Sequence, residues 1–203
     1  MDPDEFATTL GVSRETIERL TAYADLLVRW QARINLVGPD TLPRLWQRHM
    51  LDSAQLLELI PPTARRVVDL GSGAGFPGLV LAVLGAPDVH LVESDARKCA
   101  FLREAARVSG TTVTVINRRI EQVPPLAADV VTARALAPLS KLLDWAVPHL
   151  AAGAICLFLK GRGCEDELTQ ASKDWNITLD RVPSVSDPSG IILYLKEVCR
   201  GRA

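Results

Sequence analysis

This sequence has few cysteines, no long apolar run and almost no net charge, and each of these features argues against a class of protein. The 203 residues include four cysteines, none of them spaced as a C-x-x-C pair, so neither a disulfide framework nor a zinc site is indicated. No run of about 18 consecutive apolar residues occurs. The opening segment MDPDEFATTL lacks the basic and apolar regions of a signal peptide. We therefore expect a soluble, cytoplasmic protein with no membrane association and no metal site.

The charge balance is close to neutral. Lysine and arginine total 23 and aspartate and glutamate total 24, which gives a formal net charge of -1. A chain with this balance has no overall positive field, so any affinity for nucleic acid must come from a local patch. The hydrophobic content of 48% over 203 residues is enough for one substantial core. Length and composition thus favour a single domain with an appendage.

Residues 1–62 are predicted to be a helical N-terminal segment packed on the core. Ser13 is a suitable N-cap for a helix over residues 14–35, and a second helix is predicted over residues 42–59. The residues of one face of the first helix recur at steps of three and four, as one buried face requires: Ile17, Leu20, Ala24, Leu27, Trp30 or Gln31, and Ile34. Two successive prolines then end the second helix and set the boundary with residues 63–203.

The pattern changes after this boundary, where short β-branched runs alternate with helical stretches, as in an open α/β sheet. Strands are predicted over residues 66–70, 89–93, 112–117, 129–134, 154–160, 177–182 and 190–197. A helix is expected between each consecutive pair of the first six predicted strands. Only PSVSDPSG separates the last two strands, which is too short for a crossover helix, so they should pair antiparallel. The predicted fold class is therefore α/β, a Rossmann-like, mostly parallel sheet of seven strands with an antiparallel C-terminal hairpin.

The segment VVDLGSGAGFPG, residues 67–78, places four glycines directly after the first predicted strand. An open α/β sheet binds its ligand at this position, beyond the carboxyl ends of the strands. Two known patterns overlap here. GAGFPG, read from Gly73, matches the G-x-G-x-x-G fingerprint of dinucleotide-binding proteins. DLGSGAG, read from Asp69, matches the loop of enzymes that use S-adenosylmethionine.

Charge and donor groups separate the two patterns. A pyrophosphate needs several backbone N–H donors at a helix N-terminus and no anion beside them, but Pro77 removes one donor and Asp69 adds a negative charge. S-adenosylmethionine has no phosphate and carries cationic amino and sulfonium groups, so a nearby carboxylate favours it. Gly71, Gly73 and Gly75 then let the backbone approach the cofactor closely. The alternative is a tight turn that uses glycine only for its backbone freedom.

Two further acids extend this candidate cofactor site. Glu93 ends the second predicted strand, where an acidic side chain accepts hydrogen bonds from both ribose hydroxyls of an adenosine. The neighbouring Asp95 is instead a candidate cap for the next helix. After the third strand, Ile120 can cover an adenine ring and Glu121 can reach its edge. The alternative for Glu121 is a solvated acid in a loop.

Four motifs together resemble one family over essentially the whole chain. They are RHMLDS (48–53), DLGSGAGFPG (69–78), ARALAPL (133–139) and FLKGRG (158–163). In this order and spacing they resemble the RsmG/GidB family of bacterial ribosomal RNA guanine-N7 methyltransferases, which act on 16S ribosomal RNA of the small subunit. The GFPG extension and RHMLDS are far more specific than the glycine loop alone.

This resemblance implies a class I methyltransferase fold with S-adenosylmethionine as the cofactor. It also implies a guanine of the decoding-region loop as the target. The cofactor contacts that it carries over are Gly71, Phe76, Ile120, Glu121 and Arg134. Guanine N7 has an in-plane lone pair and no proton to lose, so no general base is expected, and most of the catalytic effect should come from proximity and orientation. We therefore expect Arg134 and Lys160 to position the reactants.

The charged motifs leave several roles open. Arg134 ends the fourth predicted strand, where it can bind guanine O6, a phosphate or the methionine carboxylate, or form a surface ion pair. Lys160 and Arg162 either face the same crevice or lie on a solvated turn. On the second helix, Asp52 is interpreted as a structural link between the helical segment and the sheet, whereas the roles of Arg48 and His49 stay open. The candidate RNA contacts are Arg44, Arg48, His49, Arg134, Lys160 and Arg162, with Arg118 and Arg119 weaker candidates.

Three alternative functions remain. The first is an NAD(P)-linked oxidoreductase, which Asp69, Pro77 and the antiparallel hairpin disfavour. The second is a ribosome assembly factor that binds the cofactor without catalysis, and the third is a small-molecule methyltransferase with the helical segment as a lid. Because affinity for phosphates scales with the cations presented, a nearly neutral chain suggests a ribosomal particle or assembly intermediate, rather than free RNA, as the partner. We expect the protein to be a monomer.

Overall fold

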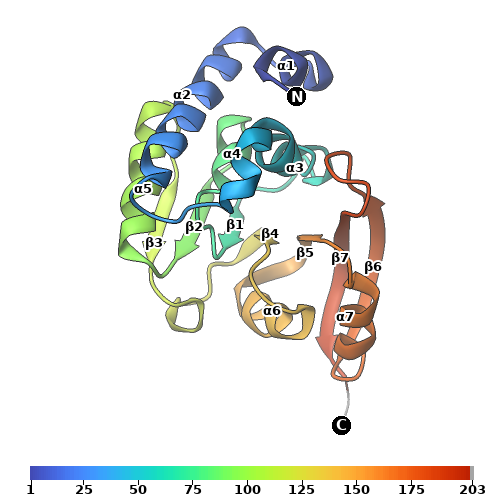
Figure 1. Ribbon diagram of the computed structural model, residues 1–203. Coiled ribbons are helices and arrows are strands. Elements are labelled where there is room, and N and C mark those ends of the chain that lie inside the picture. Colours follow the sequence, from blue (N-terminus) through green and yellow to red (C-terminus); the bar gives the residue numbers. More distant parts are fainter. Residues whose placement is uncertain (202–203) are drawn as a thin grey trace.

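A computed structural model describes residues 1–201 of the chain (Figure 1). It contains a seven-stranded sheet in the order β3-β2-β1-β4-β5-β7-β6. The strands are β1 (Val67–Leu70), β2 (Val89–Glu93), β3 (Thr114–Asn117), β4 (Ala128–Arg134), β5 (Leu150–Lys160), β6 (Trp175–Pro183) and β7 (Ile191–Arg200). The first five strands are parallel, and β7 runs antiparallel to both β5 and β6. The predicted fold class is thereby confirmed.

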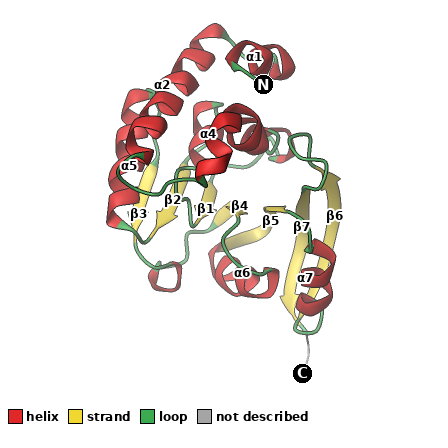
Figure 2. Cartoon of the chain, in the orientation of Figure 1, coloured by secondary structure: helices red, strands yellow, loops and turns green. Residues whose placement is uncertain are grey.

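Helices cover both faces of the sheet (Figure 2). The α-helices are α1 (Pro3–Leu10), α2 (Arg14–Gln31), α3 (Asp52–Ala54), α4 (Gly78–Val83), α5 (Ala96–Val108), α6 (Leu139–Ala146) and α7 (Cys164–Ala171). Short 3-10 helices are η1 (Pro39–Arg44), η3 (Leu57–Leu59), η4 (Ile120–Gln122) and η5 (Val147–His149), and η2 (Trp46–Leu51) is a π-helix. α2, α4 and α5 share one apolar core, whereas α6 and α7 share the other.

The side chains of β1 point alternately to the two faces of the sheet, and this explains why a core forms on each face. Successive strand residues point to opposite faces, so Val67 joins the core beneath α4 and Val68 joins the core beneath α6. Asp69 follows on the same face as Val67. The carboxyl ends of the parallel strands meet at one edge of the sheet, where the glycine loop connects β1 to α4.

The N-terminal helices pack against this sheet and differ from the predicted ones. α2 begins after Ser13 as predicted, because the Ser13 hydroxyl accepts a hydrogen bond from the Thr16 amide at 3.2 Å. α1 was not predicted. It is started by a capping box in which the Asp2 side chain accepts from the Glu5 amide and the Glu5 side chain accepts from the Asp2 amide. This acid pair, three residues apart, was the available signal.

Two of the predicted helices are wrong in form. The helix predicted over residues 42–59 is a series of short turns that includes the π-helix η2. Pro43, which has no backbone N–H to donate, lies inside the first of these turns. Between β3 and β4 the predicted helix is only the single turn η4. Two consecutive prolines follow that turn and prevent its extension.

The helical segment and the sheet share one continuous core. Phe6, Tyr23 and Met50 are fully buried in the same cluster as Phe101 of α5. Within residues 1–201, no helix combines the length and the apolar character needed to cross a membrane. The same residues contain no group of His, Cys, Asp and Glu side chains that could hold a metal ion.

Candidate functional site

The glycine loop turns sharply between β1 and α4. Gly71 has φ +66° and Gly75 has φ +94°, a left-handed conformation that side chains other than glycine rarely adopt. Space is also restricted at both positions. A Cβ on Gly71 would collide with the Leu136 side chain, and a Cβ on Gly75 would lie 2.8 Å from the Tyr23 hydroxyl. Glycine is therefore required here for its shape, whatever the ligand.

The helical N-terminal segment holds the loop from one side. The hydroxyl of Tyr23, a fully buried residue of α2, donates a hydrogen bond to the carbonyl of Ala74 in the loop. Burial raises the pKa of Tyr23 well above its usual value, so the hydroxyl keeps its proton and remains a donor. Sequence reasoning missed Tyr23, because one tyrosine on the apolar face of a helix resembles any other core residue.

Asp69 lies behind the loop rather than at a cavity wall. Its carboxylate is fully buried and accepts a hydrogen bond from the Thr132 hydroxyl at 2.8 Å. Burial raises its pKa from 3.8 to about 6. A Cβ on Gly78 would lie 2.9 Å from Asp69 Oδ2, so the carboxylate sits against the start of α4. Asp69 therefore lines neither of the cavities described below and supports the loop from within the sheet, whereas the sequence predicts a direct contact with the cofactor.

Glu93 is the acid that faces the loop. Its Oε2 accepts from the amide of Gly73 at 3.0 Å, and its Oε1 accepts from the amide of Asp95 at 2.7 Å. The Asp95 side chain in turn accepts from the amide of Arg97 at 2.8 Å and caps α5, as the alternative interpretation held. Glu93 is buried, with 8% of its surface exposed, yet it lines a cavity.

Two cavities meet at the glycine loop. The smaller, of about 310 Å³, is lined by Glu93, Ile120 and Glu121 together with Arg118, Arg119 and Trp145. The larger, of about 700 Å³, is lined by Phe76, Arg48, His49, Asp52 and Lys160, among others. Both are bounded by Gly71, Gly73, Lys98, Arg134, Ala135 and Leu136. The structure therefore brings most of the predicted site residues together around one loop.

Four predicted residues line neither cavity. They are Asp69, Gly75, Arg44 and Arg162. Arg44 and Arg162 are exposed side chains. Lys98, Leu136 and Trp145 line the cavities but were missed, because an isolated residue of each type on a predicted helix or turn gives no signal in the sequence.

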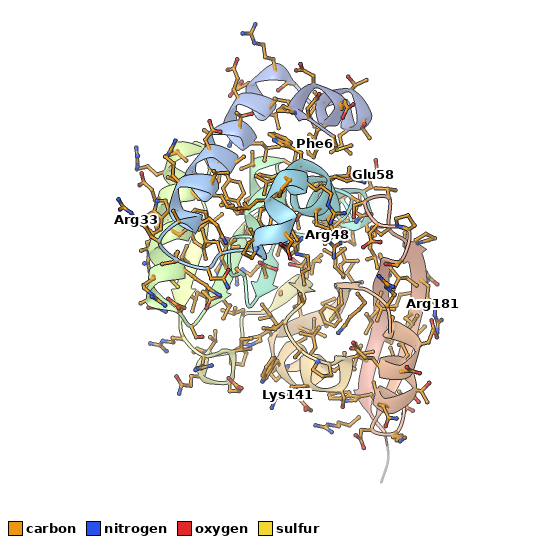
Figure 3. All side chains as sticks on the ribbon, in the orientation of Figure 1. Phe6, Arg33, Arg48, Glu58, Lys141 and Arg181 are labelled. Atoms are coloured by element: carbon orange, nitrogen blue, oxygen red, sulfur yellow. The ribbon has the colours of Figure 1, made fainter. Side chains whose placement is uncertain are left out.

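Arg134 is the centre of a buried cluster between η2 and β4. One guanidinium nitrogen donates to Nδ1 of His49 at 2.7 Å, and the other donates to Asp52 Oδ2 at 3.2 Å and to the carbonyl of Arg48 at 3.1 Å. The guanidinium also lies 5.0 Å from the centre of the Phe76 ring, onto which His49 stacks. Figure 3 shows Arg48 on the side of the helical segment that faces the sheet. Arg134 is therefore a buried partner of RHMLDS and not a surface cation.

Asp52 extends the cluster to the C-terminal hairpin. Its Oδ1 accepts a hydrogen bond from the hydroxyl of Ser186, in the loop between β6 and β7, and another from the side chain of Gln55 at 3.2 Å. The side chain is 7% exposed. The structural interpretation of Asp52 is consistent with these contacts, which join the helical segment, β4 and the hairpin.

The cluster fixes the proton of His49. Because Arg134 donates to Nδ1, the ring proton is on Nε2, which donates to the Thr41 hydroxyl at 2.7 Å. Burial and the charges of Arg134 and Arg48 lower the pKa of His49 from 6.5 to about 3. His49 is thus neutral at physiological pH, and its low pKa together with the hydrogen bonds at both ring nitrogens makes it a poor proton acceptor.

This assignment predicts a pH dependence of stability. The folded-state pKa of His49 is below the unfolded value, so below pH 6.5 the unfolded chain binds a proton that the folded chain does not. The free energy of unfolding should therefore fall as the pH is lowered from 6.5 toward 3. In His49→Asn, whose amide oxygen replaces Nδ1 as an acceptor, this fall should be shallower by about 1.4 kcal/mol per pH unit.

Urea denaturation of both proteins across this pH range measures the difference. Asp69 acts in the opposite direction, because its raised pKa makes its contribution to stability fall as the pH rises from 3.8 to about 6. That contribution is common to both proteins and cancels in the comparison. Parallel curves for the wild type and His49→Asn would show that His49 is protonated in the folded protein.

Two cations that line the larger cavity, Lys160 and Arg48, have different surroundings. Lys160 Nζ donates to Glu167 Oε2 at 2.7 Å and to the carbonyl of Ala137 at 2.8 Å, and its side chain is only 10% exposed. Glu167, in the first turn of α7, was not singled out in the sequence. Arg48, which lines the same cavity, is half-exposed and pairs with Asp187 at 3.2 Å. The larger cavity is therefore lined by a lysine held in place by hydrogen bonds and by a more accessible arginine.

These features define a class of protein. A glycine loop after β1, an acid at the end of β2 and an antiparallel β7 inserted beside β5 are the arrangement of the class I methyltransferase fold. Solved structures with this fold include a SAM-dependent methyltransferase from Aquifex aeolicus (TM-score 0.57, 17% identity, 75% of this chain and 92% of that chain). Another is M. jannaschii TYW2 in complex with AdoMet (TM-score 0.58, 16% identity, 83% of this chain and 80% of that chain).

The sequence comparisons narrow the class to one family. The family model GidB, described as rRNA small subunit methyltransferase G, matches residues 16–190, and the chain belongs to this family. Ribosomal RNA small subunit methyltransferase G of Paramagnetospirillum magneticum is 75% identical over 100% of this chain and 99% of its own length. The protein of the same name from Rhodospirillum rubrum is 56% identical over 98% of this chain and 100% of its own length. The predicted resemblance and enzyme class are confirmed.

Proposed function

We propose that this chain transfers the methyl group of S-adenosylmethionine to N7 of a guanine in 16S ribosomal RNA. The observation that carries the proposal is the meeting of two cavities at Gly71 and Gly73. One cavity offers Glu93 to a ribose, and the other is large enough for a flipped-out base. A cofactor in the smaller cavity and a base in the larger one would meet at Gly71 and Gly73, where no side chain separates them.

The hydrogen bonds of the loop support a cofactor without phosphates. The amide of Ser72 donates to the carbonyl of Val92 at 3.1 Å, and the amide of Gly73 donates to Glu93. The amides of Gly75 and Phe76 both donate to the carbonyl of Ser72. A pyrophosphate needs such amides free and pointing at it. S-adenosylmethionine has no pyrophosphate that would require them, and it supplies an electrophilic methyl group on a sulfonium.

The cavity walls suggest how the chain holds the cofactor. Glu93 would accept the ribose hydroxyls, Ile120 would cover the adenine and Glu121 would reach its edge. Gly71 and Gly73 would face the methionine portion, with Phe76 beside them. Asp69, Gly75 and Tyr23 would act indirectly, by fixing the shape of the loop.

The chemistry requires alignment rather than proton transfer. Guanine N7 attacks with its own lone pair, so the chain must place N7 in line with the methyl group and exclude water. Arg134 is held by Asp52 and His49, and Lys160 is held by Glu167. These fixed cations would position the RNA without taking a proton. The neutral His49 would serve as a rigid wall that stacks on Phe76.

The partner is proposed to be a particle rather than free RNA. Arg48, Arg118 and Arg119 line the cavities, and Arg162 is exposed nearby, so together they would contact phosphates. With a net charge of -1, these few cations give limited affinity for an isolated polyanion. We propose a monomer that acts in the cytoplasm on the small subunit or an assembly intermediate. In it, residues 1–62 form a helical segment packed on a methyltransferase domain of residues 63–203.

A methyl-transfer assay tests this function. Tritiated S-adenosylmethionine is incubated with the protein and, separately, with small subunits, free 16S RNA, ribosomal proteins and a metabolite extract, all from cells that lack this enzyme. We expect the label in 7-methylguanosine from the small subunits, at a higher rate than in free RNA at physiological salt. Label in the metabolite fraction would favour a small-molecule methyltransferase. Binding of the cofactor with no transfer to any fraction would favour an assembly factor.

A further inference from the structure

The wall of the larger cavity contains a carboxylate that the cofactor site does not use. Glu167 lies in the first turn of α7, beside the segment 135–138 that follows β4. Its Oε2 accepts from Lys160 Nζ at 2.7 Å and from the amide of Leu139 at 2.7 Å. Two donors on one oxygen fix the direction of the carboxylate. Its side chain is nevertheless 32% exposed, whereas that of Lys160 is 10% exposed.

Glu167 differs from the other acids that line this cavity because one of its carboxylate oxygens accepts no hydrogen bond within residues 1–201. Both oxygens of Asp52 are engaged, by Ser186 and Gln55 on one side and Arg134 on the other. Both oxygens of Asp187 are engaged as well, by Ser189 and by Arg48. For Glu167, residues 1–201 provide donors to Oε2 alone. Among the acids that line this cavity, Glu167 is therefore the one with a carboxylate oxygen, Oε1, that accepts no hydrogen bond within residues 1–201 and has its full acceptor capacity for a ligand.

The chemistry of guanine makes such an oxygen useful. When N7 faces the methyl group, the opposite edge of the base, with the N1–H and N2–H donors, points away from the cofactor and toward the far wall of the cavity. A carboxylate there accepts from both donors. Adenine offers an acceptor at N1 and has no amino group at C2, so it would leave the carboxylate unsatisfied.

We propose that Glu167 is a specificity-determining residue, whose Oε1 accepts hydrogen bonds from N1–H and N2–H of the target guanine while Lys160 and the Leu139 amide hold the carboxylate in place. This inference rests on the proposed function. It assigns to Lys160 the role of a positioning residue, acting through Glu167, and it places the base between the glycine loop and α7.

The test uses small subunits reconstituted with 16S RNA in which the methylated guanosine is guanosine or inosine. Inosine keeps N7, O6 and N1–H and lacks only the N2 amino group. A hydrogen bond to a charged acceptor is worth about 1.5–3 kcal/mol, so the wild type should prefer guanosine by roughly 10- to 100-fold in kcat/KM. In Glu167→Gln this preference should fall below about threefold, because the amide is a weaker acceptor than a carboxylate and can present its donor group instead.

A control and a second variant keep the outcome clear. Glu165→Gln, an exposed residue of the same helix that pairs with Arg181, should leave both rates and their ratio unchanged. Glu167→Asp keeps the carboxylate but, being one methylene shorter, moves it away from the base. This variant should lower the guanosine-to-inosine ratio, and it provides a test if Glu167→Gln fails to fold. A ratio that stays at the wild-type value in a folded Glu167 variant, with both rates reduced equally, would show a structural role and overturn the proposal. No methylation of either particle by the wild type would instead refute the proposed function.

Discussion

Replacing Arg134 by alanine should lower the free energy of unfolding by about 3–5 kcal/mol and abolish methyl transfer. The side chain of Arg134 is 16% exposed and that of its partner Asp52 is 7% exposed. Removing the guanidinium leaves the Asp52 carboxylate buried without its charge partner. It also leaves Nδ1 of His49 without a donor and uncovers the ring of Phe76. Urea denaturation gives the stability, and the assay on small subunits gives the activity.

A double-mutant cycle separates the ion pair from general disruption of the site. If the cost arises from the stranded carboxylate, Arg134→Ala combined with Asp52→Ala should be less destabilising than the sum of the two single variants, by more than about 1 kcal/mol. Arg134→Lys should recover part of the stability, since lysine supplies the charge but not the planar fork. A loss below about 1 kcal/mol in Arg134→Ala would place this arginine in a solvent-screened pair.

Replacing Gly71 by aspartate should reduce the affinity for S-adenosylmethionine by at least about 100-fold, more than 2.7 kcal/mol. Residue 71 lies on the wall of both cavities, so any side chain there occupies ligand space. Its Cβ would displace Leu136, and its φ of +66° is strained for aspartate. Isothermal titration calorimetry with S-adenosylmethionine measures the loss directly.

Gly85 provides a matched control for backbone strain. It has φ +100°, is exposed after α4, and has no atom within 4 Å of the position of a Cβ. Gly85→Asp therefore adds the same charge in a similarly unfavourable conformation, far from either cavity. It should bind S-adenosylmethionine like the wild type. If Gly71→Asp binds as tightly as Gly85→Asp, the loop does not contact the cofactor.

The strands and the loop were predictable from the sequence because their signals are local. Apolar β-branched runs and the link between the last two strands determine the sheet, and a glycine-rich turn after the first strand marks its ligand edge. Glu93 and Arg134 end strands of this sheet and Ile120 follows one, so topology alone brings them to one edge of the sheet. Their roles as ligand contacts remain predictions.

Features set by contacts between distant segments were not predictable. The π-helix η2 presents His49 to Arg134, and the start of α3 presents Asp52 to it, more than 80 positions away in the sequence. The periodicity of apolar residues cannot predict such a contact. The motif DLGSGAG predicted a contact between Asp69 and the ligand. In the structure the alternation of side chains along β1 directs the Asp69 carboxylate toward Thr132 and the start of α4. Tyr23 and Glu167 each contribute one polar group from an amphipathic helix, to Ala74 and to Lys160 respectively. A single polar group of this kind has no recognisable pattern in the sequence.

The central claim is that the loop of residues 71–78 takes a cationic cofactor without phosphates, because the amides of Ser72, Gly73, Gly75 and Phe76 already donate within the protein. Calorimetric titration of the same sample with S-adenosylmethionine and with NADH tests this most directly. We expect saturable binding of S-adenosylmethionine at one site per chain, with no heat of binding from NADH, and loss of the first signal in Gly71→Asp. Tight binding of NADH that Gly71→Asp abolishes, with S-adenosylmethionine failing to bind or to compete, would contradict the claim.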